Sequence, residues 1–391
     1  MSAVSGRVQG TVSQEFEPVR EAFAAVLRER PDHAAQVAVF ADGVPVADLW
    51  GGPDLAGDAL LGVFSSSKGA AALVAALLLQ DGILDADREV SYYWPEFAAE
   101  GKDTVKLWEL LSHRAGAVGT EAGFSLEELA DDRTVAERVA AHRPYWRPGS
   151  AFGYHGVTLG ALLGEVVLRT TGRSLQECFE QQFQRPLGLE FFLGLPERYE
   201  PRVAGILPMR PTPEQRRQWE AALPVPDSLG AIAANLHHPG VPALEELPNH
   251  RVIRAAGPAS FGGVGSARGL ARMYAAAVSG VDGRPPLLAG ETVARIAQPH
   301  SAGHDLVLHM HRVYGLGFMV DLPSQGAGAF GHDGAGGSMG FADPRSGLAF
   351  GYVRRRFPYP GGAGPEAARL AAVARRCALA ARGATPAPGT D

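Results

Sequence analysis

Strand-like patterns lie near both ends of this chain, whereas helix-like patterns fill its middle. An Asp-Gly turn separates two short apolar runs, which predicts a β-hairpin over Gln36 to Phe40 and Val44 to Trp50. The pattern becomes strand-like again only after residue 300. We expect these late strands at Gly315 to Leu322, at Gly328 to His332 with Gly340 to Ala342 as an extension, and at Leu348 to Arg354. Strands at both ends predict one antiparallel sheet made from both termini.

The predicted fold class is α+β, with the sheet flanked by two terminal helices and a mainly helical subdomain inserted between its strands. The terminal helices are expected over Phe16 to Arg30 and Pro365 to Ala381. We predict that residues 1–62 and 256–391 form the sheet domain and that residues 63–255 form the helical domain. The active site is expected at the interface of the two domains, where crevices favour ligand binding.

The motif Ser65-Ser66-Ser67-Lys68 stands where a glycine-rich loop passes into an uncharged apolar run, Ala70 to Leu79. That change of pattern predicts a helix that begins at the serines. Ser65 and Lys68 are three residues apart, so they lie on one face of the first helical turn. A lysine amine in contact with a serine hydroxyl can take its proton and create a nucleophile. Because so short a motif also occurs by chance, a serine-rich helix start with a solvated lysine is the alternative.

Composition and charge exclude several classes of function. The 391 residues are 46% hydrophobic and 20% charged, which is typical of a globular protein. The net charge of −6 and the dispersed arginines predict no nucleic-acid partner and no membrane partner. Cys178 and Cys377 are expected to be buried thiols. The polar start and the lack of long apolar runs predict a soluble cytoplasmic protein without a secretory signal, and Gly383 to Asp391 is expected to be a disordered tail.

Three further stretches contain residues that suit a site. A Pro-Gly turn at residues 148–149 precedes Tyr154, which stands just before a predicted helix. Residues 330–338 place several glycines on an expected strand, and such glycines let the backbone approach a ligand closely. Pro211 to Asn249 is rich in proline and alanine, and it forms either a loop that shapes a substrate site or a lid.

The order of these motifs, S-x-x-K, then a tyrosine motif, then a glycine-containing strand motif, resembles the serine β-lactamase and penicillin-binding-protein superfamily. Within that superfamily the chain is most similar to the class C β-lactamase-like carboxylesterases, called family VIII esterases. The resemblance extends over nearly the whole chain. Its blocks lie at residues 48–52, 64–69, 93–97, 110–116, 148–155, 331–334, 336–338 and 343–344.

This resemblance implies a role for each motif. Ser65 would be the acyl-accepting nucleophile, with Lys68 and Tyr154 as its general base and acid. A phenol, whose pKa is ordinarily about 10, can serve as a base only where a nearby lysine stabilises the phenolate. The backbone N–H groups of Ser65 and Ala335 would form the oxyanion hole.

The residues implied to border the substrate are His332, Asp333 and Gly334. His155, next to Tyr154, either lines the site or tunes the phenol. Two positions depart from the β-lactamase pattern, because Gly156 replaces the usual asparagine and His332-Asp333-Gly334 replaces Lys-Thr-Gly. Histidine is a weaker, pH-dependent substitute for a lysine that holds a substrate carboxylate. The departures therefore favour neutral esters over β-lactams and peptides, without excluding slow β-lactam turnover.

Two other patterns are weaker candidates for a site. Ser338 lies in a G-x-S-x-G sequence, but an α/β-hydrolase needs a histidine later in the chain and none follows. His304, His309 and His311 lack a clear fourth metal ligand. We therefore predict neither a metal nor an organic cofactor.

The predicted reaction is hydrolysis of a carboxylic ester through an acyl-enzyme on Ser65, with a small ester or acyl compound as substrate. The same machinery would also serve an acyltransferase, an amidase, a β-lactamase or a peptide cyclase, because the sequence does not define the second acceptor. A non-catalytic binding protein of the same fold is the second alternative, which the joint presence of Ser65, Lys68 and Tyr154 disfavours. The number of subunits stays open.

Overall fold

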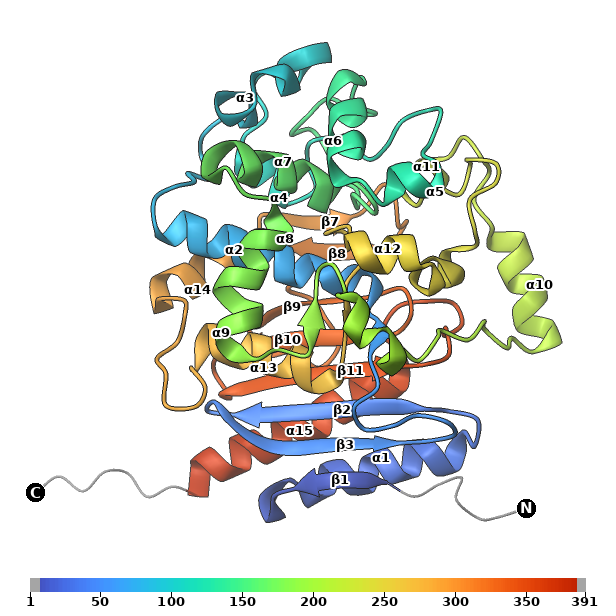
Figure 1. Cartoon of the computed structure of the whole chain (residues 1–391), viewed down its shortest axis with the longest axis vertical. Coiled ribbons are helices and arrows are strands. Elements are labelled where there is room, and N and C mark those ends of the chain that lie inside the picture. The colour runs from blue at the N-terminus through green and yellow to red at the C-terminus, as the bar shows by residue number, and fades with distance from the viewer. Residues whose placement is uncertain (1–7, 385–391) are drawn as a thin grey trace, which may run out of the picture.

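The computed structural model describes residues 8–384 and contains a six-stranded antiparallel sheet (Figure 1). Its strand order is β1-β3-β2-β11-β10-β9. The strands span Gln9–Val12 (β1), Ala35–Ala41 (β2), Val44–Gly51 (β3), Phe330–Asp333 (β9), Met339–Asp343 (β10) and Leu348–Arg354 (β11). The N-terminal and C-terminal strands meet where β2 pairs with β11, which confirms the predicted sheet. The first seven residues and most of the predicted tail lie outside the described residues.

Helices cover both faces of the sheet, which explains why β2 is an almost continuous apolar run. One face packs against the terminal helices α1 (Glu17–Glu29) and α15 (Pro365–Ala384), and Val37 and Val39 of β2 point to that side. The other face packs against α13 (Ala267–Val278), because successive side chains of a strand alternate between faces. The α+β fold class with flanking terminal helices is thus confirmed.

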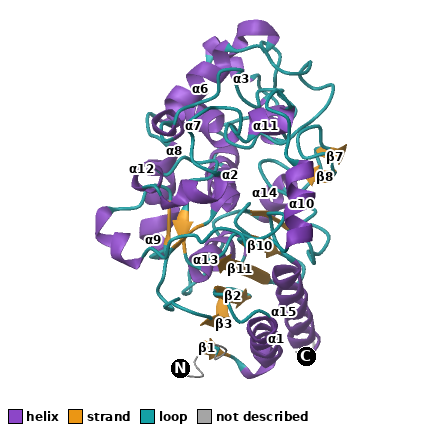
Figure 2. Cartoon of the chain, turned by 90° about the vertical axis from the view of Figure 1, so that its right-hand side faces the viewer, coloured by secondary structure: helices purple, strands orange, loops and turns teal. Residues whose placement is uncertain are grey.

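The middle of the chain forms a mainly helical layer beside the sheet (Figures 1 and 2). Its helices are α2 (Ser67–Gln80), α3 (Val90–Tyr93), α4 (Leu107–Leu111), α5 (Leu126–Leu129), α6 (Asp132–Ala141), α7 (Leu159–Thr171), α8 (Leu175–Phe179), α9 (Arg185–Leu187), α10 (Pro213–Ala222), α11 (Leu229–Ala233) and α12 (Arg251–Ala256), and α14 (Gly290–Ile296) follows α13. Short strands are β4 (Leu61–Gly62), β5 (Phe191–Phe192), β6 (Val264–Gly265), β7 (Ser301–His304) and β8 (His311–Tyr314). Within residues 8–384, no helix is both long and apolar enough to cross a membrane. The domain boundaries at residues 62 and 256 stay predictions.

Helix α2 crosses the middle of the molecule between the helical layer and the sheet (Figure 1). Nearly all of its residues are buried, and it contacts α7, α8, α14 and β9. A helix that is apolar on every side is expected to be surrounded by other elements. The uncharged run from Ala70 to Leu79 predicted a helix, and the structure shows that this helix is buried among other elements.

Two strand predictions need correction. Gly315 to Leu322 is not a ladder strand, because Gly317 adopts a φ of +81° and the Gly315 N–H donates to the Phe318 carbonyl in a local turn. The hairpin β7–β8 lies just before it instead. Residues 340–342 do not extend β9, since they belong to β10, which returns antiparallel to β9 after a tight turn. Glycine-rich sequence left the strand boundaries undetermined in both places.

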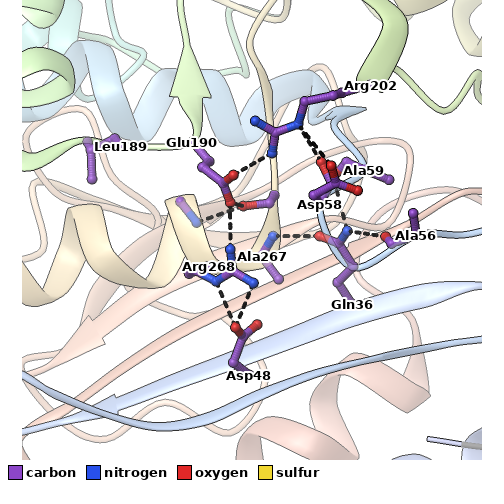
Figure 3. Close-up of polar contacts among 12 residues, drawn as sticks. Gln36, Asp48, Ala56, Asp58, Ala59, Leu189, Glu190, Arg202, Ala267 and Arg268 are labelled. Atoms are coloured by element: carbon purple, nitrogen blue, oxygen red, sulfur yellow. Dashed lines mark hydrogen bonds and ion pairs between the residues drawn. The ribbon is translucent and has the colours of Figure 1, made fainter. Parts of the chain in front are cut away.

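A polar network ties the sheet to the segments around it (Figure 3). Arg268 of α13 contacts Asp48 of β3 at 2.6 Å and Glu190 at 2.9 Å. Glu190 also pairs with Arg202, whose Nε lies 3.7 Å from Asp58. The arginine side chains are partly exposed, so each pair contributes little alone, and the network mainly fixes relative position.

Candidate active site

The candidate nucleophile Ser65 lies in a single 3₁₀ turn, Phe64–Ser66, directly before α2. Phe64 adopts a φ of +50°, an uncommon conformation for a bulky residue that its neighbours must hold in place. The Ser67 hydroxyl donates to the Phe64 carbonyl at 2.5 Å, and the Ser66 hydroxyl is 2.8 Å from that of Ser338. Two serines of the motif therefore fix the turn, and only the half-buried Ser65 is left facing outward.

Lys68 is fully buried, and its amine lies 3.4 Å from the Ser65 hydroxyl. The amine also donates to the backbone carbonyls of Gly156 at 2.5 Å and Ser260 at 2.9 Å. Burial lowers the pKa of Lys68 to about 7, although Asp132 and Asp333 oppose this shift. At neutral pH a large fraction of the amine is thus neutral and able to accept a proton.

Tyr154 lies against Lys68, with the lysine amine 4.8 Å from the centre of its ring. The phenol hydroxyl is buried and has no hydrogen-bond partner among the described residues. Burial raises the pKa of Tyr154 above its usual range, while the nearby Ser65 hydroxyl lowers it. The resting phenol is therefore protonated, next to a lysine that is partly neutral.

The turn between β9 and β10 brings Ala335 to the same place. A Cβ on Gly334 would lie 2.3 Å from the Val63 carbonyl, and a Cβ on Gly336 would lie 2.2 Å from the Phe64 ring. Only glycine permits so close an approach. The two glycines on either side of Ala335 therefore press this turn against the segment that carries Ser65.

A cavity of about 440 Å³ opens at Ser65, Tyr154 and Ala335. Its other lining residues are mostly apolar: Phe64, Gly156, Val157, Trp219, Pro224, Gly230, Ala233, Ala234, Leu244, Phe261, Val307, Leu308 and His309. None of the described residues in this wall is Asp, Glu, Lys or Arg. The segment 211–249 supplies six of them, so it shapes the cavity.

The structure places the four expected substrate-bordering residues behind this wall rather than in it. His332 is buried, its Nδ1 donates to the Asp333 carbonyl at 2.6 Å, and burial lowers its pKa to about 3. Asp333 accepts a hydrogen bond from the Ala363 N–H, and Gly334 packs on the Ser65 segment. Both ring nitrogens of His155 bond to backbone groups, and burial lowers its pKa to about 4.

Gly156 stands where the β-lactamase pattern usually has an asparagine. The structure explains why this residue has no side chain. A Cβ there would lie 2.4 Å from the Ala233 carbonyl at the end of α11. The Gly156 carbonyl accepts the hydrogen bond from Lys68. In this protein the backbone at residue 156 contacts the lysine, and α11 fills the adjacent space.

Sequence reasoning missed Asp305, which holds the wall of the cavity in place. One carboxylate oxygen accepts from the N–H groups of Tyr154 at 3.1 Å, Val307 at 2.8 Å and Leu308 at 2.9 Å. The other accepts from the Tyr314 hydroxyl at 2.8 Å. The only available signal was an aspartate in a loop, which also suits an ordinary turn. Among residues 8–384, no cluster of three His, Cys, Asp or Glu could hold a metal ion.

The fold and this arrangement suit one class of protein, the enzymes that use covalent catalysis. A serine–lysine pair at the wall of an apolar cavity has the chemistry that such catalysis needs. Comparison with known proteins is more specific, because the sequence profile of the beta-lactamase family matches residues 23–375. Esterase/beta-lactamase LipL of Mycobacterium tuberculosis is 31% identical over 370 residues, covering 90% of this chain and 84% of LipL.

Two solved structures have a similar fold. EstA from Arthrobacter nitroguajacolicus Rue61a matches with a TM-score of 0.89 and 42% identity, over 97% of this chain and 100% of EstA. A family VIII carboxylesterase matches with a TM-score of 0.85 and 32% identity, over 95% and 100% of the two chains. This chain belongs to the beta-lactamase family and is an esterase-like serine hydrolase of that family.

Proposed function

We propose that the protein hydrolyses neutral, apolar carboxylic esters through an acyl intermediate on Ser65. The observation that carries this proposal is the contact of 3.4 Å between the half-buried Ser65 hydroxyl and the buried Lys68 amine at the wall of an apolar cavity. The names of two similar proteins, an esterase/beta-lactamase and a family VIII carboxylesterase, support ester cleavage.

In the acylation step, the Ser65 oxygen attacks the ester carbonyl while the neutral Lys68 amine takes the hydroxyl proton. Tyr154 gives its proton to the leaving alkoxide, and the Lys68 ammonium reprotonates the phenolate. Water then attacks the acyl group, passes its proton to the same pair, and Ser65 leaves with a proton restored. The N–H groups of Ser65 and Ala335 stabilise both tetrahedral oxyanions, by about 3 kcal/mol each.

The preference for neutral esters follows from the charges at the site. A substrate carboxylate would be desolvated in a cavity without a charged partner, which is costly. His332 is neutral at physiological pH, because burial holds its pKa near 3, so it does not replace a carboxylate-binding lysine. We assign His332, Asp333 and Gly334 to shaping the oxyanion turn, and His155 to positioning the backbone beside Tyr154.

The test is intact-mass spectrometry after reaction with a fluorophosphonate, which leaves a stable adduct on a nucleophilic serine, and p-nitrophenyl butyrate is the ester for product analysis. We expect one adduct on the wild type, none on Ser65→Ala, and retained labelling in the matched variant Ser338→Ala. No adduct on the wild type, or an adduct that persists in Ser65→Ala, would disprove the assignment. Product analysis with an added alcohol forms the second arm, since mainly transferred acyl product would contradict hydrolysis as the main reaction.

A further inference from the structure

A second cavity, of about 280 Å³, lies between α1, α15 and the segment that leads into α10. Four arginines line it, Arg30, Arg210, Arg354 and Arg356, against two carboxylates. His33 in the same wall is neutral, because burial lowers its pKa to about 3. The cavity therefore carries an excess of two positive charges.

Two carboxylates serve as the ion-pair partners of all four arginines. Glu366 is shared by Arg354 and Arg30. The half-exposed Asp32 carboxylate lies 3.3 Å from the Arg356 Nε, without forming a hydrogen bond to it, and 3.5 Å from Arg210. One carboxylate thus serves two guanidinium groups at distances longer than a good charge-assisted hydrogen bond.

We propose that this cavity binds a small phosphate-type oxyanion and that the bound anion fixes α10. Arginine forks match the oxygens of a phosphate, and a doubly charged anion balances the two excess charges. Free phosphate and the phosphate group of a small metabolite share this chemistry, and 280 Å³ admits either.

Helix α10 connects this cavity to the candidate active site. Gln215 lines the cationic cavity, and Trp219, four residues later on the same helical face, lines the apolar cavity beside Ser65. Tyr359 also lines the cationic cavity, and its hydroxyl donates to Gln218 at 3.2 Å. Figure 1 shows α10 at the edge of the molecule, joined to the rest by long loops. An anion held by Arg210, just before α10, would therefore restrain Trp219.

The test is calorimetric titration with inorganic phosphate and with O-phosphoserine at constant ionic strength. We expect both ligands to bind at one shared site. The ligand that binds more tightly shows whether the site favours free phosphate or a phosphomonoester. Arg210→Gln should weaken binding at least about tenfold, because one charge-assisted contact is lost. The matched control is Arg217→Gln, equally exposed on α10 and outside the cavity, which should bind like the wild type.

Ser65→Ala should still bind the anion, so this result does not depend on ester hydrolysis. Phosphate should also change the tryptophan fluorescence, and Trp219→Phe should lose that change. Absence of binding, or equal effects of Arg210→Gln and Arg217→Gln, would disprove the site. Binding without any change in fluorescence would disprove its link to α10.

Discussion

Two serine-bearing turns touch at the centre of this molecule, and their hydroxyl groups are used differently. The Ser338 hydroxyl donates to the Val63 carbonyl at 2.6 Å and lies 2.8 Å from the Ser66 hydroxyl. The Ser65 hydroxyl faces the cavity, and the amine of Lys68 is 3.4 Å away. A serine acts as a nucleophile where a general base can accept its hydroxyl proton and its oxygen can reach a substrate. The turn of Ser338 instead holds the turn of Ser65 in shape.

The largest difference in activity between the two turns is expected from replacing the general base, Lys68. Lys68→Met should lower kcat/KM on the order of 10⁴-fold, since general-base catalysis disappears while the apolar side chain still fills the site. In the wild type, kcat/KM should rise with pH through about 7, because the Lys68 pKa lies there and only its neutral form accepts a proton. Buried His155 and His332 titrate well below this range, near 4 and 3.

The measurement is a pH profile of kcat/KM from pH 5 to 9 for the wild type, with activity of Lys68→Met measured alongside. An unchanged rate in Lys68→Met would remove the lysine from the mechanism. A wild-type profile that is flat between pH 6 and 8 would contradict the lowered lysine pKa.

A smaller loss of activity is expected from removing the proton donor, the Tyr154 hydroxyl. Tyr154→Phe should lower kcat on the order of 10²-fold, because the ring still packs beside Lys68 while the proton for the leaving alcohol is lost. The control is Tyr314→Phe, which removes a hydroxyl from the ring stacked on Tyr154 and keeps Tyr154 itself. If the two variants lose activity equally, the Tyr154 hydroxyl has only a structural role. Circular dichroism checks that both variants fold.

The fold was largely predictable because its signals are local and periodic. The strand over residues 348–354 and the helix over residues 267–278 match their predicted bounds, since each is a continuous apolar or amphipathic run. The hairpin β7–β8 was missed because Ser301–His304 and His311–Tyr314 are short and half exposed, so neither run looks like a strand. Their pairing depends on tertiary contacts that the sequence pattern does not contain.

The candidate site was predictable only in its motifs. Ser65, Lys68 and Tyr154 stand in recognisable local patterns, and the structure brings them together. Asp305, which accepts four hydrogen bonds at the cavity wall, has no pattern of its own, because its partners lie up to 151 residues away. Likewise, the reason for Gly156 is the approach of the Ala233 carbonyl, a contact that only the folded chain creates.

The smallest effect on turnover is expected at Ser338, where stability should change instead. Ser338→Ala removes the hydrogen bonds to the Val63 carbonyl and the Ser66 hydroxyl, and the Val63 carbonyl keeps the longer bond of 3.2 Å from the Ser66 N–H. We expect urea unfolding to show a loss of about 1–2 kcal/mol, with kcat lowered less than tenfold. The control is Ser150→Ala, which should change neither the stability nor kcat. Ser150 is exposed, so water replaces its hydrogen bond to the Arg147 carbonyl. If Ser338→Ala abolished turnover without affecting stability, the contrast between the two serine turns would be wrong.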